Sequence, residues 1–79
     1  MTGPAWLVVG EFDARVLRAT DALHARTAER VGELVGCTGD VAASCLRRLR
    51  VRMLVEPDRY GPRGWRRTWW GDVALEHAP

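Results

Sequence analysis

The stretch Thr27–Val55, TAERVGELVGCTGDVAASCLRRLRVRMLV, decides the fold of this chain. Thr27 is a natural N-cap and Gly36 supplies the left-handed residue that often ends a helix, so the segment between them is predicted to be helical. A second helix is expected to begin at Thr38 or Asp40. The sequence therefore predicts two helices joined by a short turn and followed at once by an apolar strand.

Apolar spacing in and before this stretch predicts a three-helix core within residues 12–51. The first helix is expected to have Asp13 as its N-cap and to cover about Ala14 to His24, and the third is expected to end near Val51. The residues expected to face the core are Phe12, Val16, Leu17, Ala19 and Leu23 in the first helix, Ala28, Val31, Leu34 and Val35 in the second, and Val41, Ala42, Cys45, Leu46 and Leu49 in the third.

Residues 53–70 are predicted to form a β-hairpin. An apolar strand at 53–56 leads into 57–64, which is dense in turn-forming residues, and 65–70 is rich in residues that favour strands. Alternation in this return strand places Trp65, Arg67 and Trp69 on one face and Arg66, Thr68 and Trp70 on the other. The hairpin is therefore expected to carry arginines in its loop and on both faces of its second strand.

A set of residues spread over these elements carries a resemblance to a known fold. They are Thr27, Val31, Leu34, Gly36, Leu46, Arg47, Arg48, Leu49, Leu54 and Val55. With the order of elements, residues 12–70 resemble the winged helix-turn-helix domains of bacterial transcription regulators of the MarR, ArsR and GntR type. The resemblance implies an α+β fold with three helices and a C-terminal β-hairpin wing. It also implies that the third helix enters the major groove of DNA while the wing contacts the backbone.

The chain departs from these families in two places. Met53 stands where they have a glycine of positive φ, so the exit from the third helix is expected to be built differently or to start elsewhere. The first half of that helix offers only short side chains, which are Gly39, Asp40, Ala42, Ala43 and Ser44. Only Arg47 is well placed to reach a guanine, so backbone contacts are expected to outweigh base reading.

Length and composition bound the architecture. A chain of 79 residues is expected to form a single domain, and 47% hydrophobic with 28% charged residues is typical of a soluble protein. Residues 1–10 are expected to form an N-terminal arm, and residues 71–79 a tail that closes with a short turn or frays. Neither a bilayer-spanning stretch nor a signal-peptide pattern is present, so a cytoplasmic location without a membrane partner is expected.

Charge is unevenly distributed along the chain. Residues 1–40 carry four arginines and six acidic residues, a net −2, whereas residues 41–79 carry eight arginines and four acidic residues, a net +4. The positive half is predicted to bind the phosphates of double-stranded DNA. The expected DNA-binding residues are Thr38, Ser44, Arg47, Arg48, Arg50, Arg59, Arg63, Arg66 and Arg67. A solvated helix face and a charged loop remain alternative interpretations, and a GC-rich coding sequence also explains why all 12 basic residues are arginine.

Four tryptophans are many for a chain of this length. Trp69 and one of Trp65 or Trp70 are expected in the core. The surplus favours an interface, so Trp6, Trp65 and Trp70 are candidate contacts in a homodimer or with a protein partner. Two functions therefore stand beside transcriptional regulation: a winged-helix protein-interaction module, such as a phage-like factor that binds a host protein, and an excisionase-like architectural DNA binder.

The sequence supports neither catalysis nor metal binding. No nucleophile–base pair or phosphate loop is evident. Cys37, Cys45, His24 and His77 lack the close ligand pairs of zinc sites. The two cysteines are expected to lie too far apart for a disulfide, with Cys45 buried and inert. The prediction is a non-enzymatic protein without cofactors.

Overall fold

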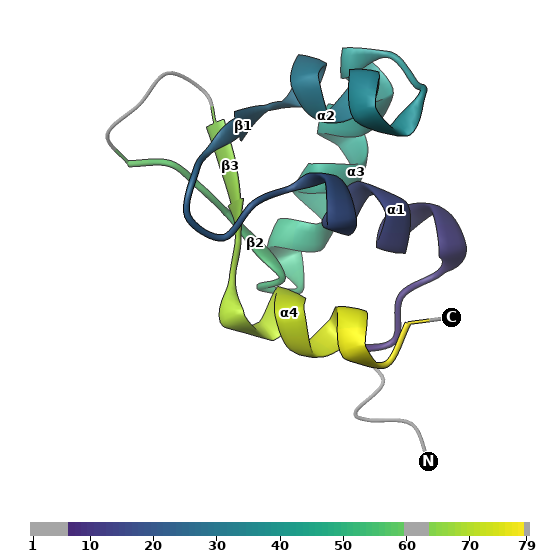
Figure 1. Ribbon diagram of the computed structural model, residues 1–79, viewed down its shortest axis with the longest axis vertical. Helices are drawn as coiled ribbons and strands as arrows, with labels where there is room; N and C mark the ends of the chain where they lie inside the picture. Colours follow the sequence, from purple (N-terminus) through teal and green to yellow (C-terminus); the bar gives the residue numbers. More distant parts are fainter. Residues whose placement is uncertain (1–6, 60–63, 79) are drawn as a thin grey trace.

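The computed structural model describes residues 7–59 and 64–78 (Figure 1). The elements along them are α1 (Glu11–Ala19), β1 (Arg26–Thr27), α2 (Ala28–Val35), α3 (Gly39–Val51), β2 (Val55–Pro57), β3 (Gly64–Arg67) and α4 (Trp69–Glu76). The strands form one antiparallel sheet in the order β1-β3-β2. The fold is therefore α+β, as the sequence predicts. Within the two described ranges, every helix is too short or too polar to cross a membrane.

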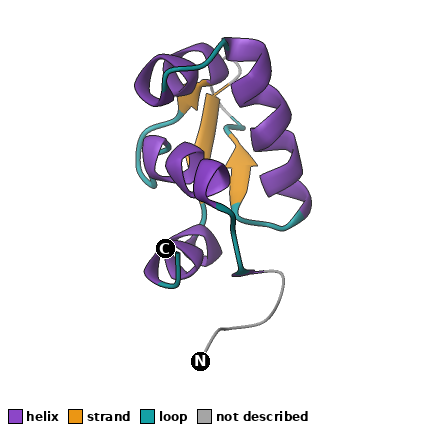
Figure 2. Ribbon diagram, turned by 90° about the vertical axis from the view of Figure 1, so that its right-hand side faces the viewer, coloured by secondary structure: helices purple, strands orange, loops and turns teal. Residues whose placement is uncertain are grey.

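The core lies between the first three helices and the sheet. Figure 2 shows α3 along one side of the molecule, and both α2 and α1 pack directly against it. Leu17 of α1, Leu46 and Leu49 of α3, and Leu54 before β2 are all fully buried. Burying a leucine side chain contributes about 1.5–3 kcal/mol to stability, so these four side chains are a large part of what holds the helices on the sheet.

β3 is the central strand, and its register depends on a glycine. Gly64 lies opposite Thr27 of β1, and Trp65 lies opposite both Arg26 of β1 and Pro57 of β2. A Cβ at position 64 would lie 2.5 Å from the Cβ of Ala25, which is too close for any side chain. Gly64 therefore allows β1 to reach the sheet.

Three helix ends confirm the sequence prediction. The Thr27 hydroxyl accepts a hydrogen bond from the Arg30 N–H (3.1 Å) at the start of α2, and the Thr38 hydroxyl accepts one from the Val41 N–H (3.2 Å) at the start of α3. Gly36 has φ = 91°, the left-handed conformation that ends α2. The turn between α2 and α3 is therefore built as the residues predict.

The exit from α3 contradicts the expectation for Met53. Met53 itself adopts φ = 64°, so the position keeps the left-handed backbone although it holds no glycine. The Met53 N–H donates to the Arg50 carbonyl (2.8 Å), and the Leu54 N–H donates to the Leu49 carbonyl (3.0 Å). This pair of bonds is a Schellman closure, and it holds a methionine in a conformation that L-residues adopt at a cost.

α1 begins and ends earlier than predicted. Gly10, not Asp13, is its N-cap, and the helix ends at Ala19 instead of His24. The Asp21 carboxylate accepts hydrogen bonds from the His24 N–H (2.7 Å) and the Leu23 N–H (2.9 Å). These two bonds form a turn that competes with the helix, and they also hold the pKa of Asp21 below its usual value.

Three residues predicted to face the core are exposed. Leu23 lies in the turn after α1 and is 80% exposed, while Leu34 of α2 and Val41 of α3 are 47% and 48% exposed. Leu23 is lost to the core because α1 ends before it. Leu34 and Val41 lie at the edge of their apolar faces, where the neighbouring helix does not cover them.

The C-terminal segment differs most from the prediction of a hairpin to residue 70 and a tail beyond it. β3 ends at Arg67, and the Thr68 hydroxyl accepts from the Gly71 N–H (3.1 Å) to start α4. Trp69 and Trp70 therefore belong to a helix. A Cβ at Gly71 would lie 2.3 Å from the Leu54 carbonyl oxygen, so this glycine lets α4 approach the chain before β2.

Candidate nucleic-acid interface

The outer side of α3 is a single exposed stripe. Asp40, Ser44, Arg47 and Val51 follow one another at the spacing that places residues on one helix face, and all four are exposed. The opposite face, which includes Cys45, is buried in the core. The stripe is therefore directed away from the rest of the molecule.

Three of the residues predicted to bind DNA, Thr38, Ser44 and Arg47, lie at or near this stripe. The Thr38 hydroxyl already caps α3, although the residue is exposed. The Ser44 hydroxyl accepts from Arg47 Nη2 at 3.4 Å. This contact holds the guanidinium along the helix, and an exposed guanidinium has further N–H donors for a phosphate or a guanine edge.

Arg47 also lines a depression between α3 and the hairpin. It has a volume of about 320 Å³ and is lined by Ala28, Glu29, Ala43, Arg47, Pro57, Asp58, Gly64 and Trp65. Glu29 and Asp58 place two carboxylates in it, so its charge is mixed. An anion is therefore favoured at the Arg47 side and disfavoured deeper toward the start of α2.

Arg48 and Arg50 lie on opposite flanks of α3. Arg48 is directed toward α1, where its Nη2 atom lies 3.2 Å from Asp13 Oδ1. Arg50 is exposed on the other flank and lines a groove of about 500 Å³ together with Arg59. The other lining residues of this groove are Met53, Val55, Glu56, Pro57, Thr68 and Trp70. The structure therefore brings Arg47, Arg50 and Arg59 to the side of α3 that meets the hairpin.

The hairpin carries one exposed arginine in its described part. Arg59 is exposed just after β2. Arg66 is half-buried, with Nη2 3.7 Å from Asp58 Oδ1, and its buried Nε atom has no hydrogen-bond partner among the described residues. Arg63, also predicted to contact DNA, lies outside the described residues, as does Trp6.

Arg67 is directed inward, against the expectation that it contacts DNA. Its Nε atom donates to Asp72 Oδ1 at 2.6 Å, and Nη1 donates to the carbonyls of Leu17 (2.9 Å) and Thr20 (3.0 Å). The side chain is only 18% exposed. Arg67 therefore ties β3 and α4 to the end of α1, because its guanidinium bridges a carboxylate of α4 and two carbonyls at the end of α1.

The tryptophans are distributed differently from the prediction. Trp65 is partly buried against the core. Trp69, predicted to be in the core, is 66% exposed, and Trp70 is 37% exposed. The two rings make an edge-to-face contact with centroids 4.5 Å apart. The sequence signal for this pair was the Thr68 cap, which the strand-forming character of the aromatic residues obscured.

No protein-family model, curated protein or solved structure matches the chain. Charge, exposure and position single out Ser44, Arg47, Arg50 and Arg59, and we name these four residues the α3–hairpin surface.

The cysteines lie away from this surface. Both are free, and Cys45 is 1% exposed with its thiol donating to Asp13 Oδ1 at 3.2 Å. Burial raises the pKa of Cys45 to about 12, and the hydrogen bond to Asp13 adds to this. The thiol therefore stays protonated and unreactive at neutral pH. Within residues 7–59 and 64–78, no cluster of histidine, cysteine and acidic side chains is suited to a metal ion.

Proposed function

We propose that this protein is a winged helix-turn-helix DNA-binding protein that acts in transcriptional regulation. The observation that carries the proposal is the α3–hairpin surface, in which an exposed helix stripe bearing Arg47 lies beside Arg50 and Arg59. The fold assignment is supported by the order of the elements, in which three helices, with the short strand β1 after the first, are followed by the β2–β3 hairpin. β1 pairs with the hairpin in one sheet. In this proposal α3 enters the major groove, and the hairpin follows the phosphate backbone.

Contacts with phosphates supply most of the proposed affinity. Arg47 is central on the stripe, while Arg50 and Arg59 reach the backbone on the hairpin side. Ser44 and Arg47 are the two side chains placed to meet base edges, and Asp40 on the same stripe repels phosphate. The proposed recognition is therefore weak in sequence preference and strongly dependent on salt.

The test is fluorescence anisotropy with a mixed-sequence duplex over a series of salt concentrations. The Arg47→Ala and Arg59→Ala variants are each expected to flatten the log–log salt slope by roughly one unit. Arg30→Ala is the matched control, because Arg30 is an exposed arginine on α2 paired with Glu33 (3.9 Å) outside the proposed surface. Equal slopes for all three variants, or no binding at low salt, would refute the proposal.

A second candidate, protein interaction, rests on the exposed tryptophan pair of α4. Trp69 at 66% and Trp70 at 37% exposure are the kind of residues that dominate protein interfaces. We propose that this pair joins two copies of the chain, which would let a small module contact two half-sites. Sedimentation equilibrium is expected to show a dimer that Trp69→Ala converts to a monomer. A monomer for the wild type excludes this role for the pair.

A further inference from the structure

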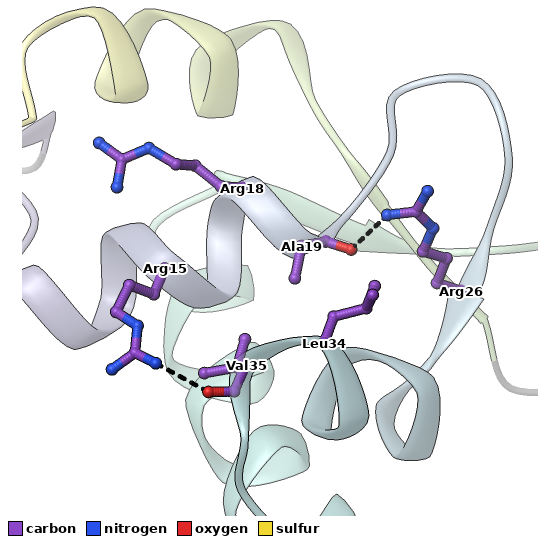
Figure 3. Close-up of a pocket in the computed structure, with 6 residues that line it drawn as sticks. All are labelled: Arg15, Arg18, Ala19, Arg26, Leu34 and Val35. Carbon is purple, nitrogen blue, oxygen red and sulfur yellow. Dashed lines mark hydrogen bonds between the residues drawn. The ribbon is translucent and has the colours of Figure 1, made fainter.

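A shallow depression on the α1–α2 side of the molecule carries cationic and apolar groups that the proposed DNA contacts do not use. It has a volume of about 370 Å³ and is lined by Arg15, Arg18, Ala19, Arg26, Leu34 and Val35 (Figure 3). α1 packs against the inner face of α3, so this depression and the exposed stripe of α3 face different sides of the molecule. A ligand here leaves the α3–hairpin surface free.

Two of the arginines are held in place by neutral acceptors. Arg15 Nη2 donates to the Val35 carbonyl at 2.8 Å, and Arg26 Nη1 donates to the Ala19 carbonyl at 2.7 Å (Figure 3). These carbonyls lie at the ends of α2 and α1, where the helix dipoles favour a cation. In the described part of the chain, neither guanidinium has a carboxylate partner, so both keep their charge for an external anion.

An exposed leucine lies among these arginines. Leu34 is 47% exposed, and Ala19 and Val35 beside it form the rest of the apolar lining. Figure 3 shows Leu34 between Arg26 on one side and Arg15 on the other. Lining residues that are either cationic or apolar, with no acidic one among those described, suit a partner that presents carboxylates around an apolar side chain.

The other possible occupants fit less well. A symmetric contact with a second copy would bring arginines against arginines. A DNA backbone offers phosphates but nothing to cover Leu34. A small ligand would stay largely in water, because the depression is too shallow to enclose most of its surface.

We propose that this depression binds an acidic segment of a partner protein, with an apolar side chain on Leu34 and carboxylates on Arg15 and Arg26. The bidentate geometry of arginine with carboxylate fixes the orientation of the segment. The site does not depend on the proposed DNA binding, and it allows the chain to hold DNA and a protein at the same time.

The probe is a short fluorescein-labelled peptide that carries leucines flanked by glutamates, and its binding is followed by anisotropy. Leu34→Glu is expected to weaken binding about tenfold or more, because the new carboxylate repels the peptide and pairs with the arginines. The substitution lies on the exposed side of α2 and keeps a good helix former, so circular dichroism is expected to show an unchanged fold. Val41→Glu is the matched control, since Val41 is equally exposed (48%) and lies outside the depression.

Two further peptides and a duplex separate the remaining explanations. A peptide with serines in place of leucines is expected to bind more weakly, and so is one with glutamines in place of glutamates. The proposal is overturned by equal binding to Leu34→Glu and wild type, by equal binding of the serine peptide, or by displacement of the peptide with duplex DNA. Arg47→Ala is expected to leave peptide binding unchanged, so this test and the DNA test fail independently.

Discussion

Arg47 and Arg67 are the same residue type in the same basic half of the chain, yet the fold uses them in opposite ways. Arg47 is exposed on α3 and makes a long contact, 3.4 Å, to the Ser44 hydroxyl one turn earlier. Arg67 is 18% exposed and ties β3 and α4 to the end of α1 through one carboxylate and two carbonyls. The comparison teaches that an arginine is available to an external anion only where its guanidinium is exposed and keeps N–H donors that internal acceptors do not use.

The largest expected effect is the loss of stability when Arg67, the inward-directed arginine of this comparison, is replaced. Arg67→Ala is expected to reduce the free energy of unfolding by about 3 kcal/mol, because the carbonyls of Leu17 and Thr20 lose a charged donor in a partly buried place. Urea denaturation measures the loss. Arg50→Ala removes the same charge from an exposed site and serves as the control, with an expected change below about 0.5 kcal/mol. Equal losses of stability in the two variants would contradict the conclusion that Arg67 has a structural role that Arg50 lacks.

α3 also has a buried face, which carries Cys45, and an exposed face, which carries Arg47. The dependence of stability on pH tests the burial of the inner face. The thiol of Cys45 has a pKa of about 12 in the folded protein, raised from 9.0 by burial. Because the folded pKa is raised, the stability that the protonated thiol contributes is complete below about pH 9 and is lost as the pH rises from 9 toward 12. The wild type is therefore expected to lose stability in this window more steeply than Cys45→Ala. Parallel pH profiles would show that the inner face of α3 is accessible to water.

Thiol labelling gives the same test a second readout. Cys37 is half-buried and is expected to react with a thiol reagent at pH 8, whereas Cys45 is expected to react only on unfolding. Mass spectrometry after labelling identifies the modified residue. Rapid labelling of Cys45 in the folded protein would contradict its burial.

The parts of the fold that the sequence predicted are those encoded locally. Thr27, Gly36 and Thr38 act through hydrogen bonds and backbone conformations within a few residues, so their roles follow from residue type. The end of α1 was missed because Asp21 forms a turn that competes with a helix still supported by apolar spacing. Trp69 and Trp70 were placed in a strand because aromatic residues favour strands, but the cap at the preceding threonine decides the outcome.

The candidate site combines residues that helical spacing locates with residues that only the folded chain brings together. The stripe containing Ser44 and Arg47 follows from helical spacing once the buried face is known. The inward direction of Arg67 cannot be predicted from the sequence, because its acceptors, the carbonyls of Leu17 and Thr20, lie some fifty residues away along the chain. The depression around Leu34 is not predictable for a related reason, since it brings together residues from three elements that only the fold places side by side.

The smallest expected effect concerns the left-handed exit from α3, beside the α3–hairpin surface. Met53 adopts φ = 64° and is 65% exposed, so Met53→Gly relieves the backbone while it removes little buried area. We expect stability to rise by about 1 kcal/mol, seen as an increase in Tm of roughly 4–8 °C for a domain of this size. Val51→Gly is the control, because Val51 is 84% exposed in the last turn of α3, where glycine is expected to destabilise the helix by a few tenths of a kcal/mol to about 1 kcal/mol. A loss of stability in Met53→Gly would mean that the packing of the methionine side chain in the groove it lines with Arg50 and Trp70 contributes more than its backbone conformation costs.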